Sequence, residues 1–360
     1  MQVFAKVLET IPPELSAQYL FTGLLGYGGN GFIAGALDRQ TGAAVAVKFI
    51  SKDRVPKGSL MVSDAFPGCS IPVEAEILRV AHHPNIVGFH ALHVDDHFFM
   101  IVMEQVTNFL RNAAEQAGAP AALPVSTEDA AILSDKVSSP SLPQPTLKNL
   151  TRPRHGHPGD LDEFLYMYGP LHPLIQRRLC NQLISAYAHL ANAGIAYLDF
   201  RGENIIVDRE FNVRLVDFGM SQFLDSPSAD APQRRRRWIS RDSQQQQQQQ
   251  QRFSVYGTRP FSAPEILTGN GYLGPEADIW ALGIIFYLVA TGGIDPFASV
   301  EHILSTSSTH LKWPVGCTVA GPQKELIERM LAHLPVERPT VAEVCASEWL
   351  SERPVDDVAP

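Results

Sequence analysis

Two short polar segments on either side of a predicted β-hairpin limit the possible folds of this 360-residue chain more than any other feature does. The first segment ends in Asn204 and the second contains Asp217. Between them, residues 205–208 and 213–216 are short runs rich in β-branched residues, separated by a turn, which is typical of a hairpin. An amide oxygen before the first strand and a carboxylate after the second can bind Mg²⁺ from two sides, because this ion prefers oxygen ligands and shares them with phosphate.

The sequences of these two segments resemble conserved motifs of the protein kinase family. Residues 197–204 read YLDFRGEN and resemble the kinase catalytic loop, whereas residues 216–219 read VDFG and resemble the motif that opens with the metal-binding Asp. Upstream, residues 26–33 read GYGGNGFI, a Gly-rich loop whose backbone N–H groups can close over phosphates. Residues 45–48 read VAVK and match the kinase strand that carries a phosphate-binding Lys.

In the kinase family a Glu forms an ion pair with the phosphate-binding Lys, and this chain offers two candidates for that Glu. Glu74 and Glu76 both lie in a segment with apolar residues at helical spacing, which runs into residues 83–87, HPNIV. Counting back from Pro84 places the family's Glu on Glu74, with Glu76 as the alternative.

The resemblance continues to the end of the chain. Residues 257–265 resemble the end of a kinase activation segment, and residues 278–283 resemble the start of the buried helix that supports the catalytic loop. Arg338 lies where kinases carry the Arg that pairs with Glu265, and we expect that buried pair to be structural.

The resemblance implies an α+β, bilobal protein-kinase fold, with a small antiparallel β lobe that includes one helix and a larger, mainly helical lobe. We expect the N-lobe at residues 17–106, an insertion at 107–158, the C-lobe at 159–350 with a second insertion at 225–252, and a tail at 351–360. We expect five strands and one helix before residue 106. Further helices are expected near residues 161–168, 172–193, 275–291, 323–332 and 340–349.

The implied cofactors are ATP and Mg²⁺. The implied ATP-binding residues are Gly26, Gly28, Gly31, Ile33, Ala46, Lys48, Met103, Glu104, Val106, Asp160, Asn204 and Asp217, of which Asn204 and Asp217 are the metal ligands. The implied catalytic residues are Asp199, Lys48, Glu74, Arg201 and Thr258. Asp199 would accept the proton of the substrate hydroxyl, and Lys48 would hold the α- and β-phosphates.

Two positions depart from the family pattern. Arg201 lies where Ser/Thr kinases usually carry Lys, and certain tyrosine kinases also have Arg there; Glu203 and Thr258 nevertheless favour Ser/Thr specificity on protein substrates. Leu198 lies where most regulated kinases have Arg, so we expect activity that does not strictly require activation-segment phosphorylation. These departures keep open a pseudokinase that binds nucleotide without useful turnover, or a scaffold.

The two predicted insertions have a composition that cannot bury much apolar surface, so we expect both to be disordered. Residues 225–252 contain the basic run Arg234–Arg237 and the polyglutamine run Gln244–Gln251. The Gln run either favours self-association or is inert. The Arg run is either a nuclear-localisation signal or a solvated charge run.

Composition narrows the class of protein further. The net charge of −9 argues against general nucleic-acid binding. The four Cys have no metal-binding spacing, which favours a reducing intracellular compartment. No apolar stretch approaches the about 20 residues that a membrane span needs, and no secretion signal opens the chain. We therefore expect a cytoplasmic enzyme, with a nuclear location as the alternative that the Arg run leaves open; the sequence says nothing about its oligomeric state.

Overall fold

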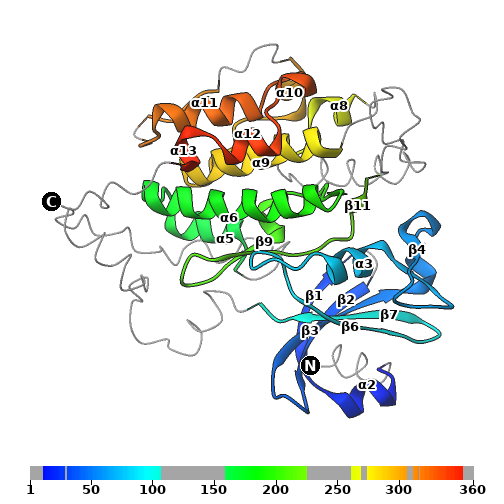
Figure 1. The fold of residues 1–360 in the computed structure, drawn as a ribbon. Coiled ribbons are helices and arrows are strands. Elements are labelled where there is room, and N and C mark those ends of the chain that lie inside the picture. Colours follow the sequence, from blue (N-terminus) through cyan, green and yellow to red (C-terminus); the bar gives the residue numbers. More distant parts are fainter. Residues whose placement is uncertain are drawn as a thin grey trace, which may run out of the picture. The chain divides into compact units, whose positions relative to one another are not determined.

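The computed structural model describes residues 11–28, 31–106, 159–224, 261–268, 274–305, 311–315 and 317–351. Its chain divides into two compact units (Figure 1). The first unit is Met1–Thr107 with Val216–Gln222, and the second is Asn108–Leu215 with Phe223–Pro360. The two predicted insertions, with their polyglutamine and Arg runs, lie outside the described residues, as do residues 352–360 of the predicted tail.

The first unit is built on an antiparallel sheet of five strands in the order β1-β2-β3-β7-β6. Its strands are β1 (Tyr19–Gly28), β2 (Gly31–Asp38), β3 (Ala44–Ser51), β6 (Phe89–Val94) and β7 (Phe98–Glu104). Between β3 and β6 lie the short helices η1 (Lys52–Arg54) and η2 (Lys57–Ser59), a hairpin of β4 (Leu60–Val62) with β5 (Ser70–Pro72), and helix α3 (Val73–Val80).

One face of this sheet carries a hydrophobic core, because every second residue of the central strands points into it. Val45, Val47 and Phe49 of β3 are 2%, 0% and 1% exposed, and the ring of Phe49 stacks on that of Phe32 at 4.5 Å. The short helix α2 (Pro13–Gln18) adds Leu15 to the same cluster. The sequence did not predict α2, whose six residues are too few to show helical periodicity.

The second unit is mainly helical. Its helices are α5 (Leu161–Tyr168), α6 (Pro173–Asn192), α8 (Pro264–Leu267), α9 (Gly274–Thr291), α10 (Val300–Ser305), α11 (Gly321–Met330), α12 (Val341–Cys345) and α13 (Glu348–Ser351), with the 3-10 helices η4 (Gly202–Asn204) and η5 (Pro335–Glu337). Its short strands are β8 (Ile195–Ala196), β9 (Ile205–Val207) and β10 (Val213–Leu215), and β11 (Gln222–Phe223) lies where the chain returns to this unit. Strands β9 and β10 form the predicted hairpin.

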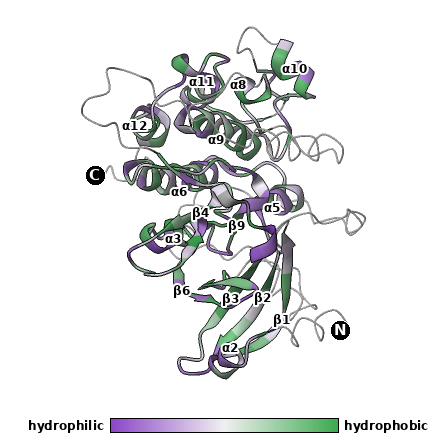
Figure 2. Cartoon of the chain, turned by 90° about the vertical axis from the view of Figure 1, so that its right-hand side faces the viewer, coloured by the Kyte–Doolittle hydropathy of each residue, from purple (hydrophilic) through white to green (hydrophobic). Residues whose placement is uncertain are grey.

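Helix α9 is the centre of the second unit's core. Nearly all of its residues are buried, so it has no polar face, which is typical of a helix packed on all sides (Figure 2). Helix α6 begins at a Pro in its first turn and is followed by Gly194, whose φ of 70° is a left-handed conformation that ends helices.

The predicted fold class is confirmed, with an antiparallel sheet and helix α3 in the first unit and a mainly helical second unit. One predicted helix, over residues 340–349, is wrong: the chain forms α12, which ends at Cys345 with Ala346 as its C-cap, and α13, which begins at Glu348. Within the described part of the chain, no helix combines the length and the apolar character that a membrane span requires.

Candidate active site

The described residues of the Gly-rich sequence lie at the end of β1 and the start of β2. Gly28 pairs with Gly31 and Gly26 pairs with Ile33 across this hairpin. A Cβ atom placed on Gly31 would lie 1.7 Å from the carbonyl oxygen of Phe49, so no other residue fits this close backbone approach. The register brings Ile33 opposite Lys48 on β3.

Lys48 is the centre of an acidic cluster in the first unit. Its Nζ atom donates to Glu74 Oε1 at 2.5 Å and to Asp217 Oδ1 at 2.8 Å. The side chains of Lys48 and Glu74 are 16% and 7% exposed, whereas that of Asp217 is 41% exposed. The structure therefore brings Glu74, rather than Glu76, to Lys48, and adds a third predicted site residue from a distant part of the chain.

The charge of Lys48 is stabilised by this cluster. Burial opposes the positive charge, but the carboxylates of Asp217 and Glu74 outweigh it and raise the pKa of the ammonium group. Lys48 is therefore a fixed cation at physiological pH, as a residue that binds phosphate oxygens must be.

Asp217 has an unusual backbone conformation. Its φ of 57° lies in the left-handed region, which costs a non-glycine residue of order 1–3 kcal/mol. The carboxylate offsets part of this cost, because Oδ1 also accepts from the backbone N–H of Gly219 at 3.2 Å. The same conformation turns Asp217 toward Lys48 while leaving the carboxylate partly exposed.

Four of the predicted ATP-binding residues lie on β3 and at or just after the end of β7. Ala46 pairs directly with Met103, and both are 7% exposed. Glu104 is held by the loop before β6, since its Oε2 atom accepts from Gly88 N at 3.2 Å. Val106, the last described residue before the predicted insertion, is half-buried. Contact of these residues with a nucleotide stays a prediction.

Asp199 and Asn204 form a second cluster, in the second unit. The Nδ2 atom of Asn204 donates to Asp199 Oδ2 at 2.7 Å and to the Asp199 backbone oxygen at 3.0 Å. Asn204 is 6% exposed and lies at the end of η4, immediately before β9. Because Nδ2 makes both contacts with Asp199, Oδ1 is the atom with which Asn204 would bind a cation.

Arg201 lies between these two residues and forms an ion pair with Glu203. Their side chains are 15% and 18% exposed. Gly202 separates them, and a Cβ atom at this position would lie 2.2 Å from Asp162 Oδ1. The segment that contains Gly202 therefore packs closely against helix α5.

The start of the same loop is held by Asp278, near the beginning of α9. Its Oδ2 atom accepts from Tyr197 N at 2.8 Å and its Oδ1 atom accepts from Leu198 N at 2.7 Å. Leu198 has a φ of 66°, and these two hydrogen bonds stabilise that strained conformation just before Asp199. Asp278 is 1% exposed, and burial raises its pKa to about 7, although the hydrogen bonds from Leu198 and Tyr197 oppose the rise.

Aromatic rings fill the space beneath the loop. The ring of Phe200 contacts that of Tyr197 at 4.6 Å and that of Tyr187 on α6 at 5.3 Å. Both Tyr rings are fully buried. Tyr197 therefore fills the hydrophobic interior beneath the loop.

Asp160 has a structural role that the sequence did not indicate. Its Oδ1 atom accepts from Glu163 N at 2.8 Å, which caps the N-terminus of α5. The residue is 6% exposed, and burial raises its pKa to about 7. Its contact with ATP stays a prediction.

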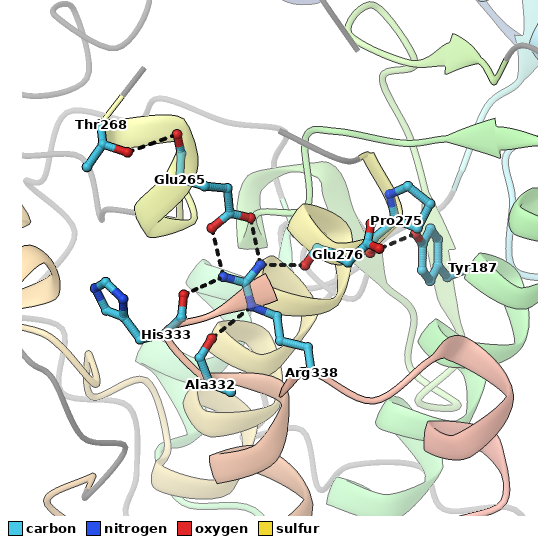
Figure 3. Close-up of polar contacts among 8 residues, drawn as sticks. All are labelled: Tyr187, Glu265, Thr268, Pro275, Glu276, Ala332, His333 and Arg338. Carbon is cyan, nitrogen blue, oxygen red and sulfur yellow. Dashed lines mark hydrogen bonds and ion pairs between the residues drawn. The ribbon is translucent and has the colours of Figure 1, made fainter. Parts of the chain in front are cut away.

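Thr258, the remaining predicted catalytic residue, lies outside the described residues. The predicted pair of Glu265 with Arg338 is confirmed (Figure 3), with Nη1–Oε1 at 2.7 Å and Nη2–Oε2 at 2.8 Å. Arg338 also donates to the backbone oxygens of Glu276, Ala332 and His333, and its guanidinium lies over the ring of Trp280. This network joins the start of α9 to helix α8.

Asp278 is the functional residue that sequence reasoning did not single out. The segment that contains it was recognised, but nothing in the sequence showed that its carboxylate reaches the loop some 80 residues earlier. A lone Asp at the start of an otherwise apolar helix is the signal that would have found it, because a buried carboxylate needs hydrogen-bond donors.

The two clusters fit ATP and Mg²⁺ in their chemistry. A partly exposed carboxylate on Asp217 and an amide oxygen on Asn204 are ligands that Mg²⁺ prefers. Lys48 supplies a buried, permanently charged donor for phosphate oxygens.

Comparison with known proteins supports this interpretation. A family profile described as "Protein kinase domain" matches residues 155–350, which is more than half of the chain. Sperm motility kinase 2A of Mus musculus is 28% identical over 358 residues, covering 96% of this chain and 53% of the mouse protein. The PAS domain-containing serine/threonine-protein kinase of Mus musculus is 24% identical over 339 residues, covering 94% of this chain and 19% of that protein.

A plant relative gives the same result. CBL-interacting serine/threonine-protein kinase 17 of Arabidopsis thaliana is 24% identical over 326 residues, covering 90% of this chain and 58% of the plant protein. The chain thus spans about half the length, or less, of the mouse relatives and somewhat more than half of the plant one. On the strength of the matched profile and the residue clusters described above, the chain belongs to the protein kinase family.

Proposed function

We propose that the chain is an ATP- and Mg²⁺-dependent protein kinase that transfers the γ-phosphoryl group of ATP to a Ser or Thr hydroxyl of a protein substrate. The observation that carries the proposal is the pair of intact clusters, Lys48 with Glu74 and Asp217, and Asp199 with Asn204. A kinase-shaped protein that had lost catalysis would have no need to keep all five residues.

Each residue has a role in the transfer. Lys48, oriented by Glu74, binds the α- and β-phosphates. Asp217 and Asn204 would hold Mg²⁺, which would supply positive charge to offset that of the phosphates. Asp199 orients the substrate hydroxyl and accepts its proton as the bond from the hydroxyl oxygen to the γ-phosphorus forms. The bond between that phosphorus and the β-phosphate oxygen breaks, and ADP leaves.

Catalysis in such a reaction is mostly positioning and charge stabilisation, because the transition state is loose and highly anionic. The protein's contribution is therefore to fix charged groups before the substrate arrives. The hydrogen bonds from Tyr197 and Leu198 to Asp278 fix the loop before Asp199, and the contacts of Asn204 fix the side chain of Asp199 itself.

Specificity for Ser or Thr is supported by residues near the catalytic loop. Glu203 before Asn204 resembles the Ser/Thr pattern, and the PAS domain-containing and CBL-interacting relatives carry "serine/threonine" in their names. Peptides that differ only in a Ser, Thr or Tyr acceptor test this part of the proposal. Faster phosphorylation of the Tyr peptide would contradict it.

The second candidate is a pseudokinase or scaffold that binds nucleotide without useful turnover. The observation in its favour is that Arg201 is paired with Glu203, so that its guanidinium is engaged within the loop itself. Measurements of nucleotide binding and of phosphate transfer, made on the same protein, separate the two candidates.

The test compares the chain with two Asp-to-Asn variants, using radiolabelled ATP, Mg²⁺ and a protein substrate. Asp199→Asn removes the proton acceptor and should lower transfer by about 10²–10⁴-fold while nucleotide binding persists. Asp96→Asn is the matched control, since Asp96 is exposed and has no assigned role in the site. Equal signal from the unmodified chain and Asp199→Asn, with nucleotide binding intact, would establish the pseudokinase instead.

A further inference from the structure

The β4–β5 hairpin lies in the stretch of chain between Lys48 and Glu74, the two residues of the buried ion pair. Its second strand ends at Pro72, and α3 begins at Val73 with no loop between them. The hairpin is thus covalently continuous with the helix that carries Glu74.

A side-chain hydrogen bond also joins the hairpin to α3, about one turn after the start of the helix. Ser63 is the first residue after β4, and its Oγ atom donates to Glu76 Oε2 at 2.9 Å. Arg79 donates to the same carboxylate from Nε at 2.8 Å and from Nη2 at 2.6 Å. Ser63 and Glu76 are 5% and 8% exposed, so water does not compete strongly for this hydrogen bond.

Helix α3 is too short to be stable in isolation, so contacts with the rest of the unit must hold it in place. It has eight residues, fewer than the about 12–15 below which isolated helices are marginal in water. Its N-cap residue is Pro72, and no side chain caps the first turn. Its position therefore depends on packing and on the side chains that tie it to its neighbours.

Glu74 and Glu76 point to different sides of α3. Successive helix residues are turned by about 100°, so these two side chains are about 200° apart around the axis. One carboxylate contacts Lys48 and the other contacts Ser63. A rotation of α3 that withdraws Glu74 from Lys48 therefore also breaks the bond between Glu76 and Ser63.

We propose that Ser63 is a positioning residue, which acts through Glu76 to hold α3 in the orientation that brings Glu74 to Lys48. The importance of that orientation for ATP rests on the proposed function, whereas the attachment itself does not. We assign Ser63 no catalytic role, since the hydrogen bonds of its side chain to the described residues go to α3 and to the hairpin.

Hydrogen–deuterium exchange tests the attachment without any need for enzyme activity. In the Ser63→Ala chain, the backbone amides of residues 77–81 should exchange about ten- to a hundredfold faster, the factor expected from one hydrogen bond to a charged group. Ser70→Ala is the matched control, because Ser70 lies on the other strand of the same hairpin and is exposed. Its α3 amides should exchange as in the unmodified chain.

A double-mutant cycle tests whether Ser63 acts through Glu76. Ser63→Ala should speed exchange strongly in the unmodified chain but have little further effect in a chain that already carries Glu76→Ala. Equal acceleration in both backgrounds would overturn the proposal, and so would normal exchange in Ser63→Ala.

Kinetics then separate positioning from a merely structural role. The Ser63→Ala chain should show a several-fold higher KM for ATP and an unchanged KM for the protein substrate, because α3 influences the phosphate-binding Lys48. An unchanged KM for ATP alongside faster α3 exchange would overturn the positioning role. Absence of phosphate transfer in the unmodified chain would contradict the proposed function instead, which the exchange data would leave intact.

Discussion

At the scale of single residues, Arg201 is the clearest departure from the family's catalytic loop. A guanidinium is always charged and offers several donors in a fixed plane, whereas an ammonium is a compact point charge. Arg201 is paired with Glu203 in the same loop. Phosphate oxygens near Asp199 would therefore compete with Glu203 for this cation.

We predict that Arg201→Ala lowers kcat by about 10²–10³-fold, the usual effect of removing one group that stabilises developing charge. Arg201→Lys keeps the charge and should stay within about tenfold of the unmodified chain. Steady-state kinetics with saturating ATP measures both. An unchanged kcat in Arg201→Ala would mean that the guanidinium serves only to hold Glu203.

At the scale of secondary-structure elements, α9 carries one buried carboxylate at its start, and this carboxylate holds the catalytic loop. The pKa of Asp278 is raised from 3.8 to about 7 by burial, so the folded chain binds this proton more tightly than the unfolded chain does. Between about pH 4 and pH 7, the folded state therefore holds the extra proton, and stability falls as pH rises through that window.

We predict that Asp278→Asn removes this part of the pH dependence. The effect amounts to a few kcal/mol at most, at about 1.4 kcal/mol per pKa unit. Urea unfolding of both chains at pH 5 and pH 8 measures it, and Asp160, whose pKa is also raised to about 7, is present in both. An identical pH dependence in the two chains would contradict the prediction.

The elements that the sequence predicted well are those with long periodic patterns or caps. Helices α5, α6 and α9 lie within a residue or two of their predicted bounds. The apolar spacing of α6, the glycines that follow α5 and α6, and the almost continuous apolar run of α9 are local signals. The break between α12 and α13 was missed, since buried residues on both sides of Ala346 continue the apolar pattern across it.

Candidate site residues could be predicted where they lie in a recognisable local sequence motif. Contacts between residues that are far apart in the sequence could not be predicted. Lys48, Glu74, Asn204 and Asp217 were singled out from their local sequence motifs, and the structure places Lys48 against Glu74 and Asp217. The contact of Ser63 with Glu76 depends on the β4–β5 hairpin, whose strands of three residues are too short to show a periodic sequence pattern. Asp278 reaches Leu198 from 80 residues away along the chain, a separation that a single sequence does not resolve.

At the scale of the whole molecule, the question is whether the chain needs phosphorylation to become active. Leu198 has no charge to pair with a phosphate, and its backbone is already fixed by Asp278. We predict that kcat stays within about 100-fold when the hydroxyl groups of the predicted activation segment are removed together. The residues to be changed are Ser226, Ser228, Ser240, Ser243, Ser254 and Tyr256. A larger loss, measured on the full chain, would contradict this.

The division of the chain into units has a consequence for how the protein is made. Residues 216–222 belong to the first unit although the rest of that unit ends at Thr107, so the polypeptide leaves the unit and later returns to it. Asp217 is separated from Lys48 by 169 residues. At about 5–20 residues per second, a ribosome needs roughly 10–30 s to synthesise that stretch. For that time Lys48 lacks one of its two carboxylate partners, and the first unit is completed only after Asn108–Leu215 of the second has been translated.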